Sequence, residues 1–199
     1  MRNLFCILAV IAVLAGCTNS PQSPNADDAT IAAVSYKNQG PTTLTLYTVL
    51  NNRTNAGAHT SLLIGASERV LFDPAGSFKA KGIPERNDVL FGFSPEVERI
   101  YAGAHARETY RVVIQTLEVS PQQAEQAYRL ALQAGPVAGG FCASATAGIL
   151  RQIPGFETIR GTFYPDRLMT DFGKIPGVQT RIYREYDDPS LEKALAALN

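Results

Sequence analysis

The chain has few cysteines and no excess of either charge, and both shortages exclude classes of protein. Three cysteines among 199 residues are too few for a scaffold held together by disulfides. The 18 basic and 18 acidic residues cancel, whereas a nucleic-acid-binding domain normally carries a basic face. The sequence also lacks a His-Glu-x-x-His motif, a closely spaced cysteine pair and a P-loop. We therefore predict no metal ion, no nucleotide cofactor and no nucleic-acid partner.

What is present suits a folded domain. The chain is 45% hydrophobic and 18% charged, which is too apolar and too balanced for a disordered protein. A chain of this length buries roughly 68–70% of the surface that it exposes when unfolded. Composition therefore indicates a globular protein, and its function has to be argued from a site.

The N-terminus has the pattern of a secretory signal. Arg2 supplies a positive charge, and the apolar run from Leu4 to Val13 is shorter than the roughly 20 residues that span a bilayer. The sequence Leu14-Ala15-Gly16-Cys17 then resembles the lipobox of a bacterial lipoprotein. We predict a signal peptide at residues 1–16 and lipidation of Cys17. An ordinary signal peptide followed by a chance cysteine is the alternative.

The segment after the lipobox predicts a tether. Residues 17–30 are polar, include two prolines and show no apolar period, which is typical of a flexible linker. Thr18, rather than aspartate, follows Cys17, and by resemblance to the enterobacterial sorting rule this favours the outer membrane. We expect a lipid-anchored protein of the bacterial envelope that faces the periplasm, with the membrane as its partner through Cys17.

Cys142 would be the one thiol left in the mature chain. Cys6 leaves with the signal peptide and Cys17 carries the lipid, so Cys142 has no disulfide partner in an oxidising compartment. Such a thiol is either buried and inert or exposed for chemistry.

Residues 31–199 predict a single domain of the α+β class, an antiparallel sheet with helices packed on it. Alternating apolar residues predict strands at 43–50, 58–64, 70–73, 110–119 and 180–186. Helices are expected after the capping box Ser120–Gln123, at 143–153 and at 165–172. Residues 76–108 are rich in glycine and proline and predict irregular structure, for which a flap beside the site is one role.

Cys142 lies where a thiol becomes reactive. It follows Gly139-Gly140-Phe141 and opens a predicted helix, whose free N–H groups and dipole lower a thiol pKa. The same N–H groups can hold an oxyanion, and glycines let a substrate approach the backbone. The alternative is a small buried residue at a contact between helix and sheet.

A nucleophilic thiol needs a base, and the base needs an orienting group. His59 begins one predicted strand and Asp73 ends the next, and a turn near residues 66–67 would place residue 59 opposite residue 73 or 74. Asp73 could then accept a hydrogen bond from the imidazole and fix its tautomer. A partly exposed strand histidine and a turn-forming aspartate are the alternatives. His105, interpreted as a surface loop residue, competes for the role of base.

These residues carry a resemblance to the circularly permuted papain-like superfamily, which includes permuted NlpC-type hydrolases and relatives of lecithin–retinol acyltransferase. In that family the histidine strand precedes the nucleophile helix. The resemblance implies that Cys142 is the nucleophile, His59 the base and Asp73 the third polar residue. Aspartate at that place, often a histidine, and the lack of an Asn-Cys pair depart from the acyltransferase branch. The segments that match are Gly57–Ile64, Val70–Gly76 and Gly140–Ala143.

We therefore expect a cysteine hydrolase (an amidase or peptidase) or an acyltransferase that works through an acyl-enzyme. Peptidoglycan peptides and lipid acyl groups are the substrates at the periplasmic face, and the NlpC-type resemblance favours the amide. A non-catalytic envelope lipoprotein that binds peptide or lipid with the same fold is the alternative. A toxin or secreted effector is a third interpretation, which the lipobox disfavours.

Overall fold

An antiparallel sheet of seven strands forms the centre of the computed structural model, which describes residues 25–185. The expected signal peptide and Cys17 lie outside this range. The strand order is β4-β5-β3-β2-β1-β6-β7, and all neighbours are antiparallel. The strands are β1 (Thr43–Asn51), β2 (Gly57–Gly65), β3 (Arg69–Phe72), β4 (Glu85–Arg86), β5 (Val89–Leu90), β6 (Tyr110–Glu118) and β7 (Gln179–Tyr183).

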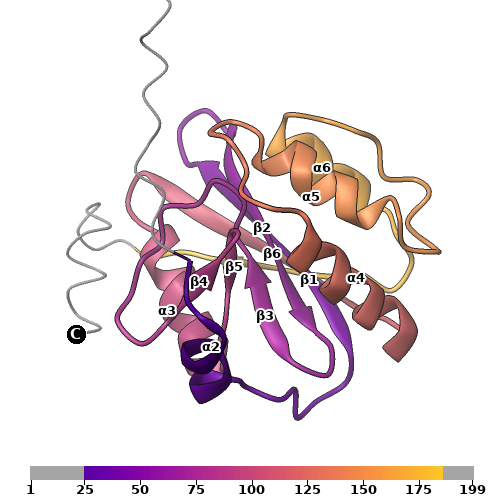
Figure 1. The fold of residues 1–199 in the computed structure, drawn as a ribbon. Helices are drawn as coiled ribbons and strands as arrows, with labels where there is room; N and C mark the ends of the chain where they lie inside the picture. The colour runs from indigo at the N-terminus through magenta and orange to yellow at the C-terminus, as the bar shows by residue number, and fades with distance from the viewer. Residues whose placement is uncertain (1–24, 186–199) are drawn as a thin grey trace, which may run out of the picture.

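Helices cover both faces of the sheet (Figure 1). The helices are α2 (Asp28–Val34), α3 (Pro95–His105), α4 (Pro121–Gln133), α5 (Cys142–Leu150) and α6 (Pro165–Phe172). The α+β class and the antiparallel sheet are confirmed. The capping box that begins α4 is confirmed as well, because Ser120 and Gln123 bond each other's backbone N–H groups.

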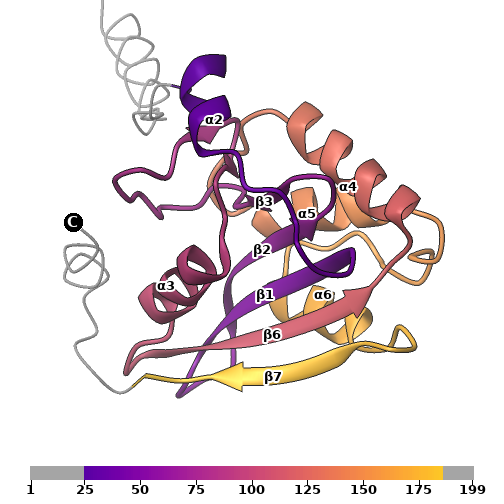
Figure 2. The same cartoon turned by 90° about the horizontal axis from the view of Figure 1, so that it is seen from below.

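The two faces have separate cores because side chains alternate along each strand. On β1, Leu44 and Leu46 pack in a core with α4, α5 and α6. Tyr47 and Val49 belong to a second core with α3. Figure 2 shows α3 on one side of β1 and β2, and α4, α5 and α6 on the opposite side. A site that uses helices from both faces therefore has to lie where the sheet has an opening.

The sheet has such an opening beside the first half of β2. Strand β3 pairs with β2 only from Leu62, opposite Phe72, to Gly65, opposite Arg69. Residues 57–61 of β2 therefore pair with β1 on one side and have no strand partner on the other among the described residues. The start of α5 lies against this free edge, as the contacts of Cys142 show below.

The register of the β2–β3 hairpin differs from the predicted one. Leu62 pairs with Phe72, so continuation of the ladder places residue 73 opposite residue 61 and not opposite residue 59. Residues 59 and 61 still share one face, because the side-chain period of a strand is two. His59 and Asp73 are therefore diagonal neighbours on the α3 face, close enough to interact.

The prediction of irregular structure at residues 76–108 is wrong in part, because the segment contains β4, β5 and the 11-residue helix α3. Ser94 caps α3 by accepting a hydrogen bond from the N–H of Val97, and Pro95 occupies the first turn. The glycines and prolines before residue 95 hid this signal. His105 consequently lies half-buried in the last turn of α3 and not in a surface loop.

The tether predicted at residues 17–30 needs a correction for residues 25–30. Asp27 caps α2, which begins at Asp28. Arg86 of β4 donates to the carbonyl of Ala26 and to the carboxylate of Asp28, and the N–H of Ala26 bonds the carbonyl of Glu85. This part of the chain is attached to the sheet edge, and residues 17–24 lie outside the described range. None of the helices within residues 25–185 is long and apolar enough to cross a membrane.

Candidate active site

His59 and Asp73 meet on the α3 face of the sheet. The Nε2 atom of His59 lies 2.7 Å from Oδ1 of Asp73. The side chains are 16% and 4% exposed, so little water competes for this contact. A carboxylate only accepts hydrogen bonds, so Nε2 carries a proton and donates it to Asp73. The structure brings together two residues that the sequence singled out.

Cys142 completes the constellation from the opposite face of the sheet. It is the first residue of α5, and its thiol lies within interaction distance of the His59 ring and of the backbone N–H groups of Thr60 and Ala143. Because Nε2 of His59 faces Asp73, Nδ1 is the ring nitrogen that remains for the thiol. Thr60 belongs to the part of β2 that has no partner on the β3 side. Because no strand lies there, the start of α5 can approach His59, whose side chain is on the other face of the sheet.

Charge stabilisation favours an imidazolium at position 59. Burial alone would lower the pKa of His59, but the negative charge and hydrogen bond of Asp73, together with Cys142, outweigh it. The pKa of His59 rises to about 10. Burial pushes the pKa of Asp73 up, yet His59 and a hydrogen bond from Tyr101 hold it below its usual value. Near neutral pH the pair is therefore ionised.

The pKa of the Cys142 thiol shifts in the opposite direction to that of His59. Burial raises the pKa of Cys142. The interaction with His59 and its positive charge, together with the N–H groups of Thr60 and Ala143, lowers this pKa by more than burial raises it. The pKa of the thiol therefore lies below its ordinary value. Phe141, the N-cap of α5, makes no side-chain cap hydrogen bond, so no capping side chain occupies the N–H groups of the first turn. The arrangement can hold a thiolate–imidazolium pair.

One aspartate outside the constellation connects its two loops. The Oδ2 atom of Asp88 accepts the N–H of Ala75 at 3.0 Å, in the turn after Asp73, and the N–H of Val137 at 2.8 Å, in the loop that leads to Cys142. The carbonyl of Asp88 also accepts the N–H of Asp73 at 2.7 Å. Asp88 has a φ of 61°, in the left-handed region that Asp tolerates better than most residues. The β4–β5 turn therefore fixes both sides of the site.

Sequence reasoning missed Tyr101 and Ser61. The Tyr101 hydroxyl lies 2.7 Å from Oδ1 of Asp73 and 2.9 Å from Oγ of Ser61. His105 is four residues along α3, its ring lies 6.1 Å from the His59 ring at 16°, and its Nδ1 bonds the Tyr101 carbonyl. Burial lowers the pKa of His105, which opposes a second positive charge beside His59. A predicted α3 would have placed residues 101 and 105 on one face and revealed this cluster.

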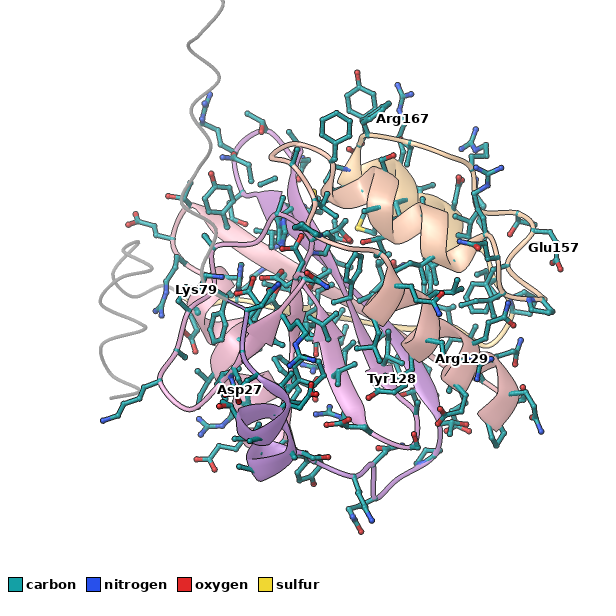
Figure 3. The ribbon with its side chains drawn as sticks, viewed as in Figure 1. Asp27, Lys79, Tyr128, Arg129, Glu157 and Arg167 are labelled. Carbon is teal, nitrogen blue, oxygen red and sulfur yellow. The ribbon has the colours of Figure 1, made fainter. Side chains whose placement is uncertain are left out.

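Exposed aromatic side chains lie at the starts of α5 and α6. Phe141, directly before Cys142, is 48% exposed, and its ring meets that of Phe163 edge to face at 5.4 Å. Tyr164, the N-cap of α6, is 56% exposed and lies under the guanidinium of Arg167, which Figure 3 shows beside α6. Phe141 and Phe163 therefore form an exposed aromatic pair next to Cys142 in the chain.

No group of three or more His, Cys, Asp or Glu residues within residues 25–185 is arranged to hold a metal ion. Comparison of the chain with protein-family models, with curated proteins and with solved structures finds no match. The functional argument therefore depends on the geometry of Cys142, His59 and Asp73.

Proposed function

We propose that this protein is a cysteine hydrolase or acyltransferase in which Cys142 is the nucleophile, His59 the general base and Asp73 the group that orients His59. One observation carries the proposal. Asp73 binds Nε2 of His59 at 2.7 Å, and the Cys142 thiol, which interacts with the same ring, stands at the start of a helix. A nucleophile, its base and an orienting carboxylate in hydrogen-bonding sequence are what covalent catalysis requires.

The proposed reaction passes through an acyl-enzyme. With the proton of Cys142 already on Nδ1 of His59 in the ionised pair, the thiolate attacks the carbonyl carbon of an amide or ester. Backbone N–H groups at the start of α5 hold the oxyanion. Collapse breaks the bond to the amine or alcohol, which takes the proton from His59. Water, or an acceptor alcohol or amine, then gives a proton to His59, attacks the thioester and releases Cys142. Asp73 stays ionised throughout.

The fold and the location belong to the same proposal. A histidine strand that precedes the nucleophile helix, on an antiparallel sheet, supports a permuted papain-like domain. The sequence Leu14-Ala15-Gly16-Cys17 supports a lipid anchor in the bacterial envelope, at the outer membrane facing the periplasm. Peptidoglycan peptides and lipid acyl groups are the substrates within reach there, with the amide favoured by the resemblance to NlpC-type hydrolases.

The test is the rate at which Cys142 is alkylated as a function of pH. A full-length chain with Cys6→Ser and Cys17→Ser retains Cys142 as its only thiol. We expect fast alkylation well below the ordinary thiol pKa of about 8.5. In the same background, His59→Ala should abolish the fast reaction. A rate that follows an ordinary thiol and is equal in both proteins would refute the catalytic proposal.

The second candidate is a binding module that keeps the fold without turnover. The exposed rings of Phe141, Phe163 and Tyr164 favour it, because such side chains bind peptides and lipids. The Cys142 residue is 6% exposed, which suits a structural thiol. This function predicts slow alkylation, together with peptide or vesicle binding that survives Cys142→Ser.

A further inference from the structure

One carboxylate oxygen of Asp73 accepts hydrogen bonds from two side chains. Its Oδ1 atom lies 2.7 Å from Nε2 of His59 on β2 and 2.7 Å from the hydroxyl of Tyr101 on α3. All three groups lie on the α3 face, and Tyr101 is 1% exposed. The carboxylate is therefore held from two directions by groups of different elements.

The direction of the Tyr101 hydrogen bond follows from counting protons. The hydroxyl has one proton and two neighbours, Asp73 and Ser61. An ionised carboxylate can only accept, so the proton of Tyr101 points to Asp73. The hydroxyl of Ser61 then donates to the oxygen of Tyr101. In this series of hydrogen bonds, the hydroxyl protons of Ser61 and Tyr101 both have an acceptor.

Packing fixes the ring of Tyr101. The rings of Tyr47, Phe78 and Phe93 meet it edge to face at 5.7, 5.1 and 5.7 Å, and the ring of His105 lies at 4.3 Å. Aromatic rings in such contacts have one well-packed orientation. The hydroxyl is therefore presented to Asp73 at a fixed place, independently of the loop that carries Asp73.

We propose that Tyr101 is a positioning residue, which holds Oδ1 of Asp73 in line with His59 and so keeps Nδ1 of His59 directed at the Cys142 thiol. The inference rests on the proposed function. The proton of Cys142 moves only as far as His59. Asp73 and Tyr101 keep their own protonation states, and Tyr101 acts by stabilising the ionised carboxylate.

The other ionisable groups around this contact come from three elements. Burial lowers the pKa of His105 of α3, which favours its neutral form, and its Nδ1 donates to the Tyr101 carbonyl. Cys142 of α5 faces the far side of the His59 ring. Tyr47 of β1 points its hydroxyl at Glu98 and away from Asp73. Tyr47 is therefore a matched control: a buried tyrosine of the same core whose hydroxyl has another partner.

The experiment compares Tyr101→Phe with Tyr47→Phe in the full-length Cys6→Ser, Cys17→Ser background. The first readout is the alkylation rate of Cys142 near pH 6, with wild type and His59→Ala as references. The second is the NMR signal of the Nε2–H proton of His59, which reports the contact with Asp73 whether or not the thiol reacts. Thermal unfolding shows that each variant is folded.

We expect Tyr101→Phe to lower the alkylation rate about tenfold, the size of one hydrogen bond to a charged group, and to speed the exchange of the His59 proton. Tyr47→Phe should stay within about twofold of wild type in both readouts. Equal behaviour of the two variants, with fast wild-type alkylation that needs His59, would overturn the role of Tyr101 alone. Slow alkylation of the wild type, at the same rate as in His59→Ala, would overturn the proposed function and this inference together. A lower rate with an unchanged His59 proton would also overturn the inference.

If Tyr101→Phe does not fold, Ser61→Ala decides the question. That variant removes the donor to Tyr101 and leaves the rings in place. We expect a loss in the same direction but smaller, about threefold, with faster exchange of the His59 proton. No change in either readout would count against the proposal.

Discussion

The hydrophobic cores on the two faces of the sheet differ in composition. The core under α4, α5 and α6 is mostly aliphatic, with alanines on the helices, such as Ala124, Ala127 and Ala143. The core under α3 is rich in aromatic rings and encloses the polar contacts of Asp73 with His59 and Tyr101. Small side chains allow a helix to lie close to a sheet, whereas rings and buried hydrogen bonds fix individual side chains.

This difference assigns a task to each face. The aliphatic face places the helix start that carries Cys142. The aromatic face fixes His59 and the Asp73 carboxylate beside it. The two meet at the free edge of β2, through the N–H of Thr60. Changes on the aromatic face should therefore alter the chemistry strongly, and changes on the aliphatic face away from Cys142 should mainly alter stability.

The largest expected effect comes from Asp73→Asn. The amide keeps the size of the side chain and removes the charge that raises the pKa of His59. We expect the pKa of His59 to fall well below 10, because the charge of Asp73 is removed while burial still lowers the pKa, and the rate of Cys142 alkylation near pH 6 to fall at least about a hundredfold. NMR titration of His59 and alkylation kinetics measure both. A pKa of His59 that stays near 10 would contradict the assignment of Asp73.

The next effect tests the turn after Asp73. A Cβ atom added at Gly76 would lie 1.9 Å from Oδ2 of Asp73, so the carboxylate has to move in Gly76→Ala. We expect a tenfold to hundredfold loss of alkylation rate, about what a misplacement of 1 Å costs. Gly139→Ala is the control, because a Cβ at Gly139 meets nothing within 4 Å although it is three residues before Cys142. Equal losses in both variants would show that the effect is not specific to Asp73.

A smaller effect is the pH dependence of stability that the His59–Asp73 pair causes when the Cys142 thiol is absent. In Cys142→Ser, His59 is still paired with Asp73. Asp73 raises its folded pKa above the unfolded value of 6.5, although by less than in the wild type, where Cys142 adds to the rise. The stability from this pair is complete below pH 6.5 and is lost as pH rises through the folded pKa of His59. Urea unfolding at pH 6, 8 and 10 should show a fall of at most about 1.4 kcal/mol per pH unit. The double variant with His59→Ala should lose less over that range, and equal slopes would argue against the pair.

The smallest effect lies on the aliphatic face, far from the thiol. Ser120→Ala removes one half of the capping box of α4. We expect about 1 kcal/mol of lost stability in urea unfolding, with an unchanged alkylation rate. A loss of alkylation rate comparable to that of Gly76→Ala would contradict the division of tasks between the two faces.

Local patterns predicted most of the strands and the helices at Ser120, Cys142 and Pro165. They failed at α3, where Pro84, Gly92 and Pro95 suggested a loop while Ser94 provided a cap like that of Ser120. They also failed at residues 25–30, whose polar composition suited a tether. Arg86, distant in sequence, attaches that segment to β4. Contacts between remote segments leave no local pattern from which they could be predicted.

The sequence by itself determined the α+β class, the antiparallel hairpin and the choice of Cys142, His59 and Asp73, because residue type and strand or helix period are local properties. Only the tertiary structure decided how they meet. Strand β3 pairs with just part of β2 and leaves an edge that α5 can reach. The packing of α3 brings Tyr101 to Asp73. These arrangements depend on side chains from several elements filling the same space, which no single segment encodes.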